Sequence, residues 1–163
     1  MSFTVDLKKE NNKATILMEG GIDEDSIFPK IDLSGVEQEV VVDLAKVEHI
    51  NSIGIRSWLN WFKPMASKYK FVLINCPRVV VMQMNMVDGF LPANSRVESF
   101  FVPYYCETCD LESEVLFRVG KEVTLQNGAV KIDYSPQGTC KTPECAIEID
   151  ANEAKYFRFL ALS

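Results

Sequence analysis

The stretch that decides the fold is residues 40–69, VVVDLAKVEHINSIGIRSWLNWFKPMASKY. It begins with the β-branched run 40–42, which continues into Asp43 and Leu44. Such a run is typical of a central strand that is buried on both faces. A short polar turn follows, and then Asn51 or Ser52 supplies a side chain that can cap a helix. The stretch therefore predicts a strand, a turn and a helix in direct succession.

The predicted helix is amphipathic. Its apolar residues recur at helical spacing and should bury against a sheet; they are Ile55, Trp58, Leu59, Phe62, Ala66 and Tyr69. Pro64 should kink the helix or loosen its last turn, because proline lacks an amide hydrogen.

Two residues at the helix start lie off this apolar face. Projected at about 100° per residue, Ile53 falls nearly opposite Ile55, and Ser52 sits at the helix N-terminus, where the dipole favours a phosphate. An exposed isoleucine beside an exposed serine is a candidate contact surface. The alternative is that Ser52 is only a cap and Ile53 only an isolated surface residue.

The pattern DLAKVEHINSIGIRSW resembles the strand-loop-helix signature of the STAS family, the sulfate transporter and anti-sigma factor antagonist domain. Its bacterial antagonists show a D-S-[ST]-G-[LI] motif whose first serine is phosphorylated by a partner kinase. The resemblance assigns the phosphoacceptor to Ser52 and the motif glycine to Gly54. Asn51 departs from the family's aspartate, and Ile53 departs from its serine or threonine. These departures bear on kinase recognition and not on the fold.

The rest of residues 1–102 predicts an open sheet. Residues 3–8 and 14–18 alternate as a β-hairpin, and 70–76 is a strand reached by a helix crossover. Residues 78–88 form a helix between Pro77 and Gly89, and 96–105 is an aromatic-rich strand. The predicted fold class is α/β, with a mixed sheet and helices mainly on one face. The segment between the hairpin and the central strand, where STAS domains have a full helix, has room for one or two turns.

Residues 103–163 predict a second, small β-rich module. Cys106 and Cys109 form a C-x2-C pair, and Cys140 and Cys145 form a C-x4-C pair 30 residues later. Two such turns supply four thiolates for a tetrahedral, structural Zn²⁺, as in a zinc ribbon. So short a module commonly needs a metal. A redox-active Cys106/Cys109 pair and thiols without a metal are the alternatives. Cys76 is expected in the core.

Composition excludes several function classes. A net charge of -6 over 163 residues argues against nucleic acid or an anionic membrane as a partner. No run approaches 18 apolar residues and no signal peptide precedes the first strand, so we expect a cytoplasmic protein. The sequence has no phosphate-binding glycine loop. Its one histidine, His49, has no nucleophile and acid arranged around it, so we expect no enzyme.

We therefore expect a bacterial signal-transduction protein that acts by protein-protein interaction through Asn51, Ser52, Ile53 and Gly54. Its partner would be an anti-sigma or switch kinase, and phosphorylation of Ser52 would switch the contact. A constitutive scaffold without phosphorylation and a thiol oxidoreductase using Cys106 and Cys109 remain as alternatives. The sequence leaves the oligomeric state open.

Overall fold

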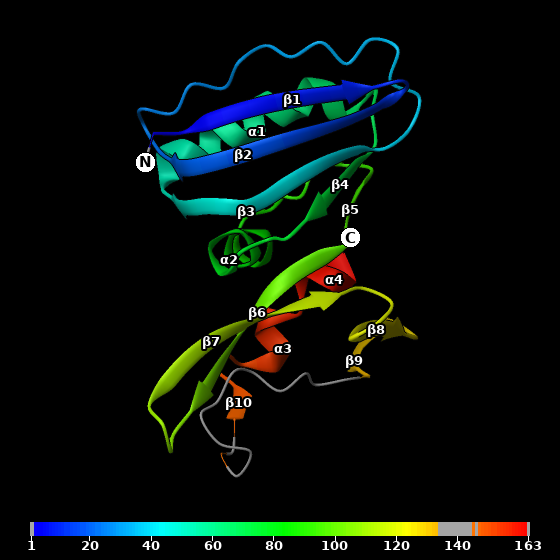
Figure 1. Cartoon of the computed structure of the whole chain (residues 1–163). Coiled ribbons are helices and arrows are strands. Elements are labelled where there is room, and N and C mark those ends of the chain that lie inside the picture. Colours follow the sequence, from blue (N-terminus) through cyan, green and yellow to red (C-terminus); the bar gives the residue numbers. More distant parts are fainter. Residues whose placement is uncertain (1, 134–144, 146, 163) are drawn as a thin grey trace.

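The computed structural model describes residues 2–133, 145 and 147–162 (Figure 1). Its helices are α1 (Ser52–Ala66), α2 (Arg78–Met86), α3 (Glu153–Tyr156) and α4 (Phe159–Leu162). Its strands are β1 (Thr4–Glu10), β2 (Lys13–Ile22), β3 (Val40–Ile50), β4 (Phe71–Ile74), β5 (Ser95–Val97), β6 (Ser99–Cys106), β7 (Leu111–Arg118), β8 (Val123–Gln126), β9 (Ala129–Ile132) and β10 (Ile147–Ile149).

The N-terminal part is built on a five-stranded sheet in the order β1-β2-β3-β4-β5. β1 and β2 form an antiparallel hairpin, whereas β2 to β5 run parallel to one another. The prediction of an α/β fold with a mixed sheet is confirmed. β3 is longer than predicted, because residues 45–50 extend the strand where a polar turn was expected.

α1 supplies the largest aromatic cluster of this part. Trp58 and Phe62 are buried, and the Trp58 ring stacks on Phe90 with a centroid distance of 4.6 Å. The indole nitrogen of Trp58 also donates to the Phe90 carbonyl at 2.8 Å. Pro64 lies within the helix, which ends two residues later at Ala66. The amphipathic pattern thus predicted both the helix and its buried face.

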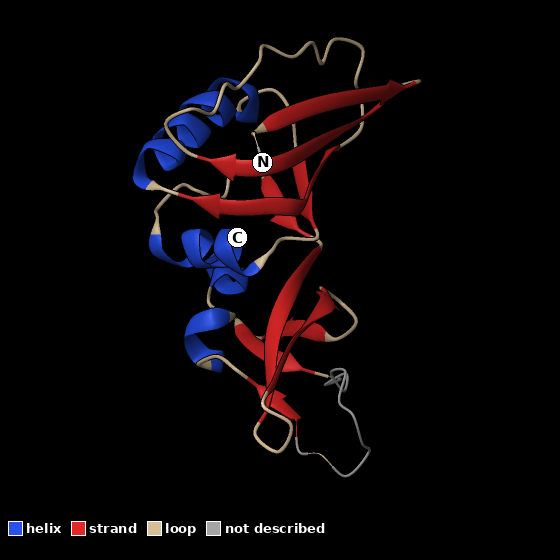
Figure 2. Cartoon of the chain, turned by 60° about the vertical axis from the view of Figure 1, so that its left-hand side comes forward, coloured by secondary structure: helices blue, strands red, loops and turns tan. Residues whose placement is uncertain are grey.

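The expectation that the helices lie mainly on one face of the sheet is wrong. α1 packs on the five-stranded sheet, where its Phe62 contacts Phe71 of β4. α2 contacts both β3 and β6 and therefore lies between the two sheets. α3 and α4 contact α2, and α4 also contacts β9 (Figure 2). The C-terminal helices therefore cover the second half of the molecule.

An extended connection, residues 23–39, joins β2 to β3 without a helix. Phe28 lies between Phe3 and Trp61, at ring distances of 4.8 and 5.4 Å. The Trp61 indole donates to the Pro29 carbonyl at 2.7 Å. These contacts hold the connection against the start of the chain and α1, where a crossover helix would otherwise pack.

The second half contains an antiparallel sheet in the order β10-β6-β7 and a β8-β9 hairpin. β6 spans the predicted boundary between residues 102 and 103. It is joined to the first sheet by a parallel bridge between Cys76 and Phe100, with the Cys76 amide donating to the Ser99 carbonyl at 3.1 Å. The zinc-ribbon identity of this half stays a prediction.

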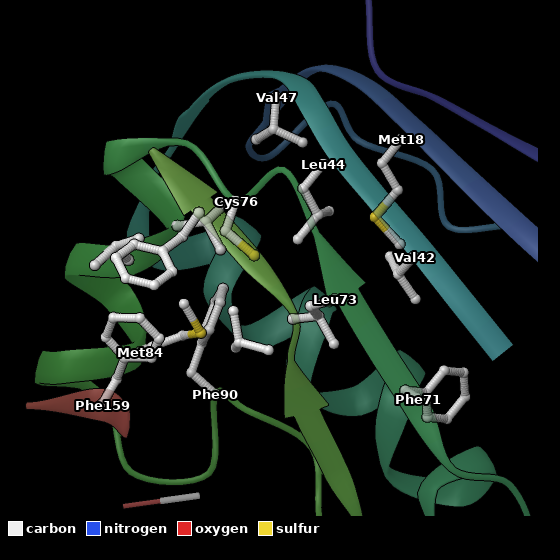
Figure 3. Packing of buried hydrophobic residues seen from close by; sticks show 14 of the residues in the cluster. Met18, Val42, Leu44, Val47, Phe71, Leu73, Cys76, Met84, Phe90 and Phe159 are labelled. Carbon is white, nitrogen blue, oxygen red and sulfur yellow. The ribbon is translucent and has the colours of Figure 1, made fainter. Parts of the chain in front are cut away.

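One hydrophobic core runs through both halves (Figure 3). Met84 of α2 and Phe159 of α4 point toward each other beside Phe90. Phe100 of β6 packs edge-on against Phe159 at a centroid distance of 5.0 Å and also contacts Phe117 of β7. The two sheets are therefore packed around shared aromatic side chains.

None of the helices in the described part of the chain is both long enough and apolar enough to cross a membrane.

A buried carboxylate closes the turn between β7 and β8. Glu122 is 4% exposed, and its two oxygens accept from the Arg118 amide at 2.9 Å and the Arg118 guanidinium at 2.7 Å. These hydrogen bonds lower the pKa of Glu122 to about 2.

We predict that Glu122→Gln lowers the free energy of unfolding at pH 7 by about 2 kcal/mol, because it removes a charge-assisted pair. The carboxylate stabilises the fold above its unfolded pKa of 4.5, and this contribution is lost as the pH falls toward 2. Urea titrations should therefore show that the free energies of unfolding of the variant and the wild type differ less at pH 3 than at pH 7. Glu112→Gln, at an exposed position of β7, is the matched control. An equal difference at both pH values would contradict this account.

Candidate functional site

The start of α1 is held by Asn51 and not by Ser52. Asn51 has extended backbone angles, and its side-chain oxygen accepts from the Gly54 amide at 2.9 Å. This is the geometry of a helix N-cap. Ser52 is therefore the first residue of the helix, and it is exposed to solvent. Of the two residues that the sequence offered as the cap, Asn51 takes this position, and the contact role of Ser52 stays a prediction.

Gly54 fixes how closely α1 approaches β2. A Cβ atom at this position would lie 2.1 Å from the Ile22 carbonyl oxygen, so only glycine fits. The same carbonyl accepts from the Asn51 amide at 3.1 Å. The end of β2 and the start of α1 are thus locked together by backbone contact. Ser52 and Ile53 lie between Asn51 and Gly54, the two residues that make these contacts.

A polar turn from the 23–39 connection lies against the same junction. The Asp23 carboxylate accepts from the Asp25 amide at 3.0 Å, and the Ser26 hydroxyl donates to the Gly21 carbonyl at 2.9 Å. Between these residues, Glu24 accepts from the side-chain amide of Asn51 at 2.6 Å. Asn51 therefore caps the helix with its oxygen and binds an acidic side chain with its nitrogen.

His49 contacts this acidic turn. Its Nε2 lies 3.1 Å from the Asp23 carboxylate, and its ring lies against Gly21, where a Cβ atom would be 2.0 Å from the imidazole. The hydrogen bond to His49 is the main cause of a lowered pKa at Asp23. The histidine thus helps to fix the turn that carries Glu24.

Two exposed isoleucines follow Asn51 and Glu24 in the chain. Ile53 is 53% exposed, as its position opposite the buried helix face predicted. Ile27, three residues after Glu24, is 80% exposed. We define the Ser52 junction as Glu24, Ile27, Asn51, Ser52 and Ile53. Glu24 and Ile27 were not predicted as site residues. The acidic run after Gly20-Gly21, which includes Glu24, does indicate a turn at the end of a strand.

The second candidate site is a cysteine cluster. The thiol sulfurs of Cys106, Cys109 and Cys145 all lie within 4.8 Å of one another. Cys106 ends β6, Cys109 lies in the turn to β7, and Cys145 comes two residues before β10. β10 pairs Ile147 with Cys106, and this pairing brings Cys145 to the other two. Cys140, the fourth predicted ligand, lies outside the described residues.

The cluster has the chemistry of a metal site. The Cys109 and Cys145 sulfurs are 3.1 Å apart, longer than the roughly 2.05 Å of a disulfide. Tetrahedral Zn²⁺ with bonds of about 2.3 Å would separate them by about 3.8 Å, which is a small adjustment. Next to the cluster, the Tyr105 hydroxyl donates to Asp110 at 2.7 Å. Cys76 lies elsewhere, in the core, and burial raises the pKa of its thiol.

Comparison with known proteins adds no assignment to either site. No family model matches this sequence, and no curated protein matches it.

We predict that Gly54→Ala destabilises the protein by about 2 to 3 kcal/mol, since the new methyl group would collide with the Ile22 carbonyl. Helix propensity alone would make the same substitution stabilising by up to about 1 kcal/mol, so the sign of the change in stability shows whether the collision occurs. Urea denaturation measures the free energy of unfolding of the variant and the wild type. Ser57→Ala on the same helix is the control and should change stability by less than about 0.5 kcal/mol. A Gly54→Ala variant as stable as the wild type would disprove the close contact.

Proposed function

We propose that this chain is a non-enzymatic, STAS-like regulatory protein that binds a protein partner through the Ser52 junction. One observation carries the proposal: an exposed serine begins a 15-residue helix whose start is fixed by Asn51 and Gly54. Exposed Ile53 and Ile27 give the junction apolar contact area. A rigid, partly apolar surface around a modifiable hydroxyl suits a switchable protein contact.

Phosphorylation of Ser52 would change the charge of this surface. A phosphate carries nearly two negative charges, and the helix N-terminus provides amide donors for it. It would also repel Glu24, which is held by the neighbouring Asn51. The partner, in this proposal an anti-sigma or switch kinase, would therefore meet a different charge and a loosened acidic turn after modification.

Asn51 stands where the STAS motif has an aspartate. Its amide nitrogen binds the Glu24 carboxylate at 2.6 Å, so a carboxylate is still present beside Ser52. An aspartate at position 51 could not make this contact, because two carboxylates repel each other. This pairing supports a retained phosphoacceptor despite the departure from the motif.

We propose that the cysteine cluster binds a structural Zn²⁺ through Cys106, Cys109, Cys145 and Cys140. Thiolate ligands favour zinc, and four of them would leave no open position for a substrate. The metal would tie β10 to the turn between β6 and β7. The alternative, a thiol oxidoreductase using Cys106 and Cys109, has weaker support, because three sulfurs converge here and not two.

A constitutive scaffold is the second candidate function. It is favoured by exposed Ile27 and Ile53, which offer contact area that needs no modification. In that case partner binding would depend on the isoleucines and would be insensitive to the charge at position 52.

We predict that Ser52→Asp loosens the acidic turn. A new carboxylate near Glu24 should repel it by about 1 kcal/mol, which corresponds to about fivefold faster deuterium exchange at the Asp25 and Ser26 amides. Ser57→Asp, about one and a half helical turns further along, is the matched control and should leave the exchange rates of these amides unchanged. The same exchange rate in wild type and Ser52→Asp would contradict the coupling.

For partner binding, we expect Ser52→Asp and Ser52→Ala to act in opposite directions, because only the first mimics the added charge. The measurement is the dissociation constant of each variant for the partner kinase. Equal affinity of both variants would refute the switch, and loss of binding in Ile53→Ser alone would favour the scaffold.

We predict that Cys106, Cys109, Cys140 and Cys145 resist alkylation until a chelator is added, because zinc-bound thiolates react slowly. Mass spectrometry of protein treated with iodoacetamide, before and after chelation, shows which cysteines have been alkylated. Cys109→Ser should lose the metal, whereas Cys76→Ala should keep it. Immediate modification of Cys106 and Cys109 in protein purified without chelators would favour the oxidoreductase.

A further inference from the structure

A groove of about 880 Å³ lies at the end of the five-stranded sheet where β2 to β5 begin. One row of residues in register crosses it from strand to strand: Thr15, Val41, Val72 and Arg96. Phe71 packs edge-on against Phe62 of α1, so the next residue, Val72, faces away from α1. The groove therefore lies on the side of the sheet opposite α1.

One arginine forms ion pairs with two of the acidic residues that line the groove. The Arg96 guanidinium donates twice to Glu39, at 3.2 Å each, and lies 3.8 Å from Glu98. Arg96 is on β5 and Glu39 precedes β3, so this pair crosses β4 between them. The Arg96–Glu39 pair passes over Val72. This valine is only 3% exposed, although its side chain faces away from α1.

Three lysines at the same groove have no such partner. Lys13, Lys68 and Lys70 are exposed, and within the described part of the chain none of them forms an ion pair. Glu37 is the one lining carboxylate that Arg96 does not engage. Because four cationic and three carboxylate side chains line it, the groove has a net charge of +1 on a chain whose net charge is -6.

We propose that this groove binds an amphipathic carboxylate, a molecule with one anionic head and an apolar body. The unpaired lysines attract the head, and the partly exposed Val36, Val41 and Tyr69 provide apolar contact for the body. The volume lies in the range of about 300–1,000 Å³ that is usual for small-molecule sites. This site is separate from the Ser52 junction, which lies at the other end of β2 and β3.

The test compares decanoate with decanol, which share the same alkyl chain and differ in charge. Two-dimensional NMR of the full chain should show decanoate shifting the amide signals of Thr15, Val41 and Val72, with an affinity at least about tenfold higher than that of decanol. A Lys68→Gln, Lys70→Gln variant should lose this preference. A Lys121→Gln, Lys131→Gln variant, which removes the same charge elsewhere, should keep it.

Three results would overturn the proposal. One is the absence of groove shifts with decanoate below its micelle concentration. Another is equal affinity for decanoate and decanol. The last is shifts confined to a different hollow, which is lined by Leu59, Ala66 and Ala93. The spectrum of each variant also reports whether it is folded, so a loss of binding is separable from a loss of structure.

Discussion

The contact between Gly54 and the Ile22 carbonyl is the constraint on which the arrangement of this protein depends. Because no side chain fits between them, α1 begins directly against the end of β2, and Asn51 can cap the helix and also bond to that carbonyl. Ser52 and Ile53 are then left on the surface, next to the turn that carries Glu24. The candidate interaction surface follows from a backbone contact in the core.

The two halves of the chain are joined by strand pairing and by a shared helix. β6 leaves the edge of the first sheet after Glu98, pairs at Phe100 with Cys76, and continues into the second sheet. α2 is shared by both halves, since Asn85 donates to the Tyr156 carbonyl at 2.9 Å. A cysteine-bound metal would therefore stabilise a region that already packs on the first sheet.

Much of the fold could be predicted from local patterns, and the rest depends on long-range pairing. Periodicity located the hairpin, α1 and β4, and the order of Pro77 and Gly89 correctly favoured a helix over a strand at α2. The β8-β9 hairpin was missed, although Asn127-Gly128, both with positive φ, is a strong hairpin turn signal. The 23–39 connection could not be predicted, because its place depends on Phe28 packing between Phe3 and Trp61.

The candidate sites show the same division. Spacing predicted Cys106, Cys109 and Cys145 as members of one site, and the register of β10 on β6 shows how Cys145 reaches the other two. Ser52 and Ile53 were located by helical projection. Glu24 was not, because its bond to Asn51 requires β2 and β3 to end side by side. Residue type and spacing thus indicated the cysteines, Ser52 and Ile53, and tertiary structure added Glu24 and Ile27.

The most direct test of the regulatory role is the intact mass of the protein isolated from its own host under several growth conditions, followed by peptide mapping. Our account predicts a covalent phosphate, about 80 Da, on Ser52 in at least one condition. A chain that carries no phosphate under any condition, or carries it only on another residue, would contradict the switch and leave the constitutive scaffold.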